Sequence, residues 1–228
     1  MNKSIFALAT VASAAAVSQA GPVLFDFEGT SRGKNITISY GDASDPVFEG
    51  KVFAGSILHQ VDEAMMHTYC IDPEQLAQTG ATNFEKATLD RGLLKRSQAQ
   101  ARSNTLAELA DLAGPSIWTS NASTLAAAAF QVAAWEVVSD YDASLGASSF
   151  DFSDGLFRSW GNSNVISAAS SLLAQLNFDR TDASGYSAFL HGTHQDFMGQ
   201  AVPGPGALAV AFVGLPLMAS RRRKGESL

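Results

Sequence analysis

The sequence contains a single cysteine, Cys70, among its 228 residues. One cysteine excludes an intramolecular disulfide bond. Outside the reducing cytoplasm, such a residue is free, paired with another chain or chemically occupied. A buried inert thiol is the usual state of a cysteine with apolar neighbours.

Charge is also scarce, since only 16% of the residues are charged whereas 46% are hydrophobic. This composition argues against disorder and fits a globular body with apolar terminal segments. Without Lys3, the four basic residues at 221–224 and Glu226, 10 basic and 21 acidic residues remain. So acidic a body repels phosphate backbones, and we expect no nucleic-acid partner.

The N-terminus has the pattern of a secretory signal peptide. Lys3 precedes an apolar run from Ile5 to Val17, and small residues occupy the last and third-last positions before Gly21. We expect signal peptidase to cleave between Ala20 and Gly21. A buried N-terminal helix is the alternative, but the run is short and ends at a cleavable site. The sequence therefore predicts an exported protein.

The C-terminus combines a breaker motif, a short apolar run and a basic cluster. Pro203, Gly204 and Pro205 precede the run from Ala207 to Ala219, and Arg221, Arg222 and Arg223 follow it. The run is shorter than the ~20 residues of a comfortable membrane span, and the basic end resists translocation. A transient inner-membrane anchor fits these features better than a permanent one.

This tripartite tail resembles the PEP-CTERM sorting signal of Gram-negative bacteria, which an exosortase processes at the envelope. Gly204 stands where that family usually has glutamate. The resemblance implies a cell-envelope or extracellular destination and processing near Pro203. An ordinary C-terminal anchor remains the alternative.

The pattern between the two ends predicts an α+β fold. Five β-branched or aromatic segments precede residue 75, at 23–28, 35–40, 47–53, 56–59 and 66–71. Helical patterns follow at 97–112, from Ser123 onward and at 164–176, and residues 195–202 resemble a closing strand. We therefore expect a signal peptide (1–20), one α+β domain (21–200) with a helical insert, and a sorting segment (201–228) with a separate hydrophobic helix.

Gln131 is out of place in the predicted helix after Ser123. Every other residue from Leu125 to Trp135 is apolar. A helix that is apolar on all faces lies inside the protein. A buried amide without hydrogen bonds costs about 1–3 kcal/mol, so the fold satisfies Gln131 or uses its carbonyl group.

Cys70 and Gln131 belong to two segments that together resemble the signature of the bacterial thioester domain family. Tyr69, Cys70 and Asp72 match an aromatic-Cys-hydrophobic-Asp segment, and 61 positions later Phe130, Gln131 and Trp135 match hydrophobic-Gln-x-x-hydrophobic-Trp. Ala134 is smaller than the aliphatic residue often found before the Trp. In that family the cysteine sulfur and the glutamine carbonyl form an internal thioester.

The resemblance implies a Cys70–Gln131 thioester in a pocket that includes Tyr69, Asp72, Phe130 and Trp135. An incoming amine, such as a lysine side chain or an amino sugar, would take the acyl group of Gln131 and free Cys70. The protein would then act once, as a covalent surface or matrix linker, and not as an enzyme. This reading requires neither cofactor nor metal. Alternatively, Cys70 is a small core residue and Gln131 bridges two helices by hydrogen bonds.

Two other site hypotheses are weaker. His191 and His194 lie near Asp179, Asp182 and Asp196, but two histidines on a loop are more often surface residues than metal ligands. Cys70 with His59 or His67 would resemble a cysteine peptidase, yet nothing places an oxyanion hole beside them. A non-covalent structural or carbohydrate-binding matrix protein is the alternative function.

Overall fold

The computed structural model describes residues 21–77 and 79–201. Its strands are β1 (Gly21–Gly41), β2 (Pro46–Val61), β3 (Ala64–Cys70), β4 (Thr82–Thr88), β5 (Phe157–Trp160), β6 (Tyr186–Leu190) and β7 (Phe197–Gln200). Its helices are α1 (Leu89–Gly92), α2 (Ala99–Ala113), η1 (Pro115–Trp118), α3 (Thr124–Asp140), η2 (Gly146–Ser149) and α4 (Ser163–Leu173). The predicted α+β class is confirmed: a β-rich N-terminal part, a helical insert that carries Gln131, and a closing strand.

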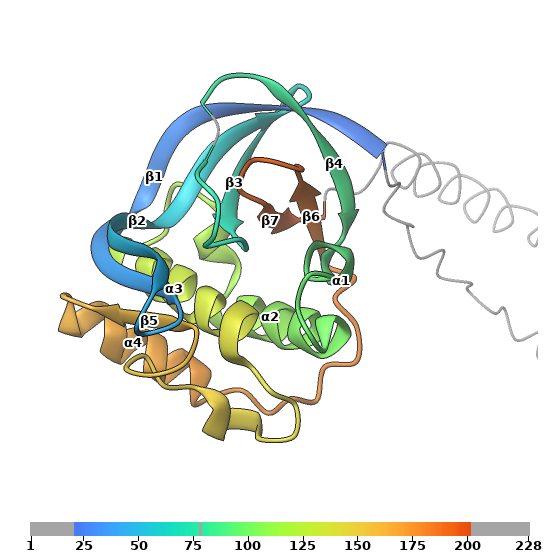
Figure 1. Ribbon diagram of the computed structural model, residues 1–228. Coiled ribbons are helices and arrows are strands. Elements are labelled where there is room, and N and C mark those ends of the chain that lie inside the picture. Colours follow the sequence, from blue (N-terminus) through green and yellow to red (C-terminus); the bar gives the residue numbers. More distant parts are fainter. Residues whose placement is uncertain (1–20, 78, 202–228) are drawn as a thin grey trace, which may run out of the picture. The chain divides into compact units, whose positions relative to one another are not determined.

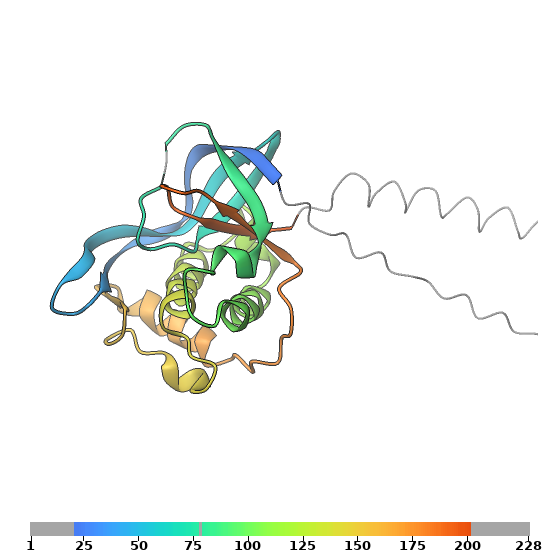
Figure 2. The ribbon, with the colours of Figure 1, turned by 45° about the vertical axis from the view of Figure 1, so that its right-hand side comes forward.

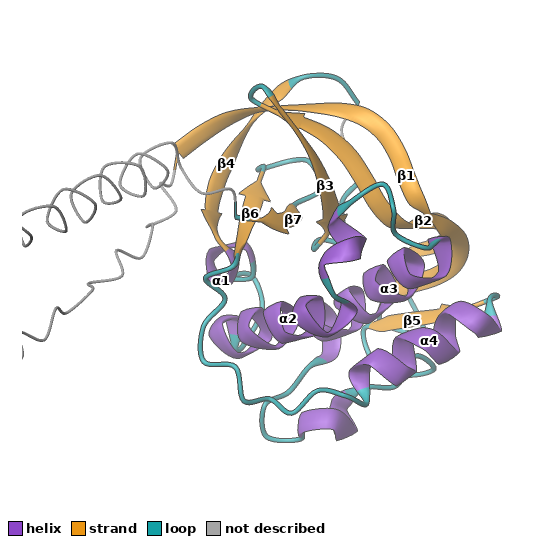
Figure 3. Ribbon diagram, turned by 180° about the vertical axis from the view of Figure 1, so that it is seen from behind, coloured by secondary structure: helices purple, strands orange, loops and turns teal. Residues whose placement is uncertain are grey.

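The seven strands form one antiparallel sheet in the order β2-β3-β7-β6-β4-β1-β5. Because β1 also pairs with β2, the sheet closes on itself and β5 adds to the far end of β1. The helices gather on one side of the strands (Figures 1 and 3). This arrangement places α3 against β1, β2 and β3.

The β1–β2 hairpin is long and bends, as Figure 2 shows. The bend coincides with register shifts near Gly29 and Gly33 of β1. A Cβ atom on Gly33 would lie 2.3 Å from the Ala54 carbonyl oxygen, and one on Gly55 would lie 2.2 Å from that of Arg32. Only glycine allows this close approach of the two strands.

Helix α3 is the central element of the core. The Ser123 hydroxyl accepts a hydrogen bond from the Ala126 N–H at 3.0 Å and caps its N-terminus. At the other end, Arg102 of α2 donates to the Val137 and Val138 carbonyls at 2.9 and 3.0 Å. Every residue from Ala127 to Ser139 is buried, as the apolar sequence predicts.

Several element predictions were incomplete. The first four predicted strands merge into two, because the bulges of β1 and β2 bend the strands without ending them. Strand β4 lies where helical character was expected to begin, and β5 lies in the segment expected to be irregular. Strand β6 was not predicted. The signal peptide, the sorting motif and the C-terminal hydrophobic helix lie outside the described residues.

Candidate functional site

Cys70 and Gln131 lie against each other in the core. Cys70 is the last residue of β3 and pairs with Phe197 of β7, and Gln131 lies within α3, which packs on β3. The Cys70 N–H donates to Gln131 Oε1 at 2.9 Å, and Gln131 Nε2 donates to the Cys70 carbonyl at 2.9 Å. The two residues are only 2% and 1% exposed. This pairing answers how the buried amide is accommodated: both of its polar groups are hydrogen-bonded.

The sulfur of Cys70 receives donors of its own. Trp135 Nε1 donates to Cys70 Sγ at 3.1 Å, and the Asp72 backbone N–H also donates to the sulfur. Burial nevertheless raises the pKa of the Cys70 thiol well above its usual range, and the Asp72 and Asp196 carboxylates push it in the same direction. The thiol therefore stays protonated and is a poor nucleophile toward solvent reagents.

A cavity of about 430 Å³ reaches Cys70, Gln131 and Trp135. Its walls are mainly apolar side chains of β1 and β2 and the segment after β3, among them Phe27, Ile38, Phe48, Val52, Phe53, Ile57, Pro73 and Leu76. Apolar walls with a few polar groups are typical of small-ligand sites. Of the described cavities, this one joins the surface to both residues of the motif.

Gln75 and Gln195 also line this cavity, and no sequence pattern predicted a role for either residue. Gln75 Oε1 is buried without a hydrogen-bond partner. Gln195 Nε2 donates to the Gln75 backbone carbonyl at 3.0 Å. The Gln195 backbone N–H donates to the Leu76 carbonyl at 3.1 Å. Gln195 thereby fixes the segment after β3, which lines the same cavity as Cys70 and Gln131.

The other residues of the predicted pocket have different roles. Tyr69 and Phe130 do not line the cavity but pack on each other, with ring centroids 4.6 Å apart. The Tyr69 hydroxyl donates to the Ile117 carbonyl at 2.9 Å. Asp72 is buried, which raises the pKa of its carboxyl group, and it accepts from the Glu74 N–H at 3.2 Å. These three residues therefore support the two motif segments, and Trp135 alone of the four lines the cavity.

Neither proposed histidine base contacts the cysteine. His59 Nδ1 lies 2.8 Å from Thr68 Oγ1, and the ring packs between Phe25 and Phe197 with centroids 4.1 and 4.6 Å away. Burial lowers the pKa of His59 to about 3, so the ring is neutral. His67 is paired in the β2–β3 ladder with Leu58, and burial lowers its pKa as well. A Cys–His peptidase site does not follow from this geometry.

His191 and His194 stack with centroids 4.3 Å apart. Across residues 21–77 and 79–201, no group of three or more His, Cys, Asp or Glu side chains is placed to hold a metal ion. The Asp196 carboxylate accepts a hydrogen bond from the His191 backbone N–H, with Oδ1 at 2.7 Å.

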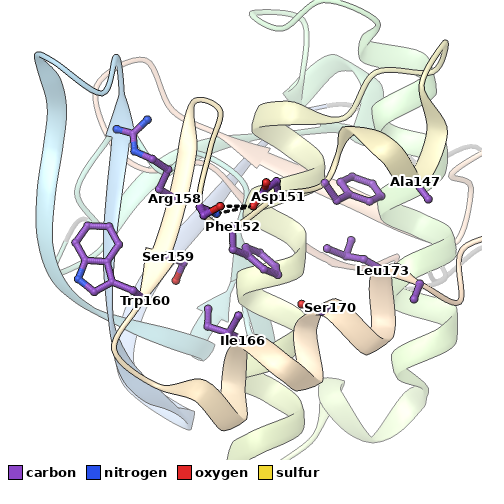
Figure 4. A pocket seen from close by; sticks show the side chains of 12 residues that line it. Ala147, Asp151, Phe152, Arg158, Ser159, Trp160, Ile166, Ser170 and Leu173 are labelled. Carbon is purple, nitrogen blue, oxygen red and sulfur yellow. Dashed lines mark hydrogen bonds between the residues drawn. The ribbon is translucent and has the colours of Figure 1, made fainter.

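A larger cavity of about 740 Å³ lies between α4, β5 and the loop around Asp151 (Figure 4). Its walls include the apolar side chains of Phe152, Ile166 and Leu173, together with alanine side chains and serine hydroxyl groups. The Asp151 carboxylate already accepts from the Ser153 N–H and hydroxyl at 2.9 and 2.6 Å. These groups are satisfied within the protein and favour no particular chemistry.

Comparison of the chain with protein-family models, curated proteins and solved structures found no match. In the described part of the chain, no helix is both long and apolar enough to cross a bilayer.

Proposed function

We propose that this chain is an exported surface or extracellular-matrix protein that forms one covalent bond to an amine-bearing target through an internal Cys70–Gln131 thioester. The observation that carries the proposal is the contact between the lone cysteine and Gln131, the one polar residue between Leu125 and Trp135 of a buried helix. Each residue is unusual in its own segment, and both line the same cavity. The likeness of both segments to the thioester domain signature supports the same conclusion.

The bond-forming step is an acyl transfer within the chain. Cys70 Sγ attacks Gln131 Cδ, the C–N bond breaks, and ammonia leaves with the thiol proton. The two hydrogen bonds between the Cys70 backbone and the Gln131 amide hold the two residues together, and such positioning lowers the barrier of a well-oriented reaction by roughly 7–11 kcal/mol. The Cys70 N–H already donates to Oε1, the atom on which negative charge develops in the tetrahedral intermediate.

The opening step attaches the target. An amine nitrogen attacks Gln131 Cδ, the C–S bond breaks, and the sulfur regains a proton, so that the target is held by an amide bond to Gln131. The apolar cavity limits the access of water, which slows hydrolysis of the thioester. The protein is consumed in the reaction and is therefore a linker and not an enzyme.

Localisation belongs to the same proposal. Signal peptidase releases the chain at Gly21, the C-terminal apolar run holds it transiently in the inner membrane, and an exosortase processes it near Pro203. This route delivers the protein to the cell envelope or the extracellular matrix, where amine-bearing targets lie.

A non-covalent matrix protein, structural or carbohydrate-binding, is the second candidate. The double hydrogen bond between Gln131 and the Cys70 backbone is also what an ordinary buried glutamine would make. Trp160 is 42% exposed on β5, and an exposed aromatic ring on a strand suits sugar binding. In this alternative, Cys70 keeps a free thiol.

Intact-mass measurement separates the two candidates. We expect the wild-type protein to be lighter than its sequence by one ammonia, and Cys70→Ala and Gln131→Ala each to have the full mass that their sequences require. Incubation with methylamine should add one methylamine to the wild-type protein alone. A wild-type protein of full mass with a titratable thiol would refute the thioester and favour the non-covalent candidate.

A further inference from the structure

Trp135 makes a contact that the proposed bond does not require. Its indole Nε1 donates to Cys70 Sγ at 3.1 Å, and the side chain is only 3% exposed. Exclusion of water needs an apolar ring at this position, but it does not need an N–H group directed at the sulfur. The Asp72 backbone N–H donates to the same atom.

Trp118 provides an internal comparison. It is also a buried tryptophan, 7% exposed, and its Nε1 has no hydrogen-bond partner. Its ring packs on Tyr69 and Tyr186, with centroids 5.2 and 5.5 Å away. A buried indole in this fold can therefore leave its N–H unpaired, so burial alone does not explain the contact between Trp135 and sulfur.

We propose that the Trp135 indole N–H stabilises the sulfur of Cys70 as it leaves during opening of the thioester, which makes Trp135 a catalytic residue of this single-use reaction. The inference rests on the proposed function. When the amine nitrogen bonds to Gln131 Cδ, the C–S bond breaks and its electron pair moves to Sγ. The attacking nitrogen loses a proton, and the sulfur gains one and ends as the Cys70 thiol.

The donor acts more strongly in the transition state than before it. A thioester sulfur is a weak acceptor, whereas a sulfur that gains negative charge is a strong one, so the Trp135 hydrogen bond strengthens as the C–S bond breaks. Negative charge on the Cys70 sulfur is especially costly at this site. Burial and the nearby Asp72 and Asp196 carboxylates disfavour a thiolate, as the raised pKa of the Cys70 thiol reflects. The indole N–H offsets this penalty without admitting water.

The kinetic test compares Trp135→Phe with Trp118→Phe in the full-length protein. Both substitutions remove one indole N–H and the same side-chain volume from the core, but only the first removes a donor from the sulfur. The rate of opening by methylamine is followed by intact mass. We expect Trp135→Phe to open at least about tenfold more slowly than wild type, the effect of one hydrogen bond to a charged group. Trp118→Phe should open at a rate within about twofold of wild type.

A spectroscopic measurement distinguishes a chemical role from a packing role. The chain has three tryptophans, so its indole N–H signals are assigned by substitution in a proton–nitrogen correlation spectrum. The Trp135 signal should move when methylamine opens the protein and when Cys70 is replaced by alanine, whereas the Trp118 signal should move much less. Thermal unfolding of both Phe variants controls for destabilisation.

The outcomes separate this inference from the proposed function. A wild-type protein of full mass overturns the proposed function, and the inference falls with it. A wild-type protein that lacks one ammonia, combined with equal opening rates for the two Phe variants, overturns the inference and leaves the thioester intact. Slow opening of Trp135→Phe without any response of the Trp135 signal to Cys70→Ala also overturns it, because the effect would then come from packing.

Discussion

Glu136 directly follows Trp135 and is a fully buried carboxyl group. Its Oε1 accepts the Asp151 N–H at 2.7 Å, and its Oε2 has no hydrogen-bond partner. Burial raises the pKa of Glu136 from 4.5 to about 8, and the charges of Asp140 and Asp151 add to this effect. Glu136 is therefore protonated in the folded protein at neutral pH.

We expect this group to make the folded state less stable as pH rises. Between pH 4.5 and about 8, the folded protein keeps the proton and the unfolded chain releases it. Each pH unit in this window lowers the free energy of unfolding by up to about 1.4 kcal/mol. Glu136→Gln keeps the acceptor for Asp151 but does not titrate, so its stability advantage over wild type should grow from about pH 5 to about pH 8.

Urea denaturation of the two proteins at several pH values measures this difference. Asp196, whose pKa burial raises to about 6, remains in both proteins, so its contribution cancels in the comparison. Parallel curves of unfolding free energy against pH would contradict the assignment of Glu136 as the titrating group.

At the scale of elements, α3 depends on a buried arginine at its C-terminal end. Arg102 donates to the Val137 and Val138 carbonyls, which have no partners within the helix, and to the Ser97 carbonyl at 2.8 Å. Arg102→Met should lower the free energy of unfolding by about 2–4 kcal/mol, because it leaves buried carbonyls unpaired. Chemical denaturation measures the loss.

Arg91→Met is the matched control for this substitution. Arg91 pairs with Glu85 at 2.9 Å, and both side chains are about half exposed. Exposed ion pairs contribute about 0–1 kcal/mol, so this variant should remain close to wild type. Similar losses in the two variants would mean that the Arg102 contacts do not hold the end of α3.

The sequence predicts the elements that are long and locally specified. Ser123 and the alanine-rich run predict α3, the helical pattern at 97–112 predicts α2, and β-branched or aromatic segments predict β1 to β3. Strand β6 is short and lacks an alternating pattern, because four of its five residues are buried. Its pairing with β4, about 100 residues earlier, leaves no local signal.

The candidate site divides in the same way. Cys70 and Gln131 are evident from the sequence because each is unusual in its own segment, whereas Trp135 is indicated only by the resemblance to the thioester domain signature. Gln75 and Gln195 are not evident, since their importance depends on hydrogen bonds across 120 residues. Nor does the sequence reveal that Tyr69 and Phe130 pack beside the cavity and not in it.

At the scale of the whole molecule, the described residues 21–77 and 79–201 form one compact unit. Its hydrophobic core runs from Phe25 to Met198. We expect removal of residues 203–228 to leave this unit folded and to release the protein from the envelope fraction. Circular dichroism and cell fractionation of the truncated protein provide the measurements. Loss of folding after truncation would show that the C-terminal segment belongs to the core.

The pairing of Cys70 with β7 also sets an order of events. Phe197, its partner in the ladder, comes 127 positions after Cys70, and β7 lies between β3 and β6. Contacts so distant in sequence form late, because closing a long loop costs entropy before any contact repays it. Until β7 pairs with β3, Cys70 has an ordinary thiol group and Gln131 an ordinary amide group. Under the proposed function, a chain still being synthesised therefore carries nothing that reacts with the amines around it, because the proposed thioester forms only after the fold is complete.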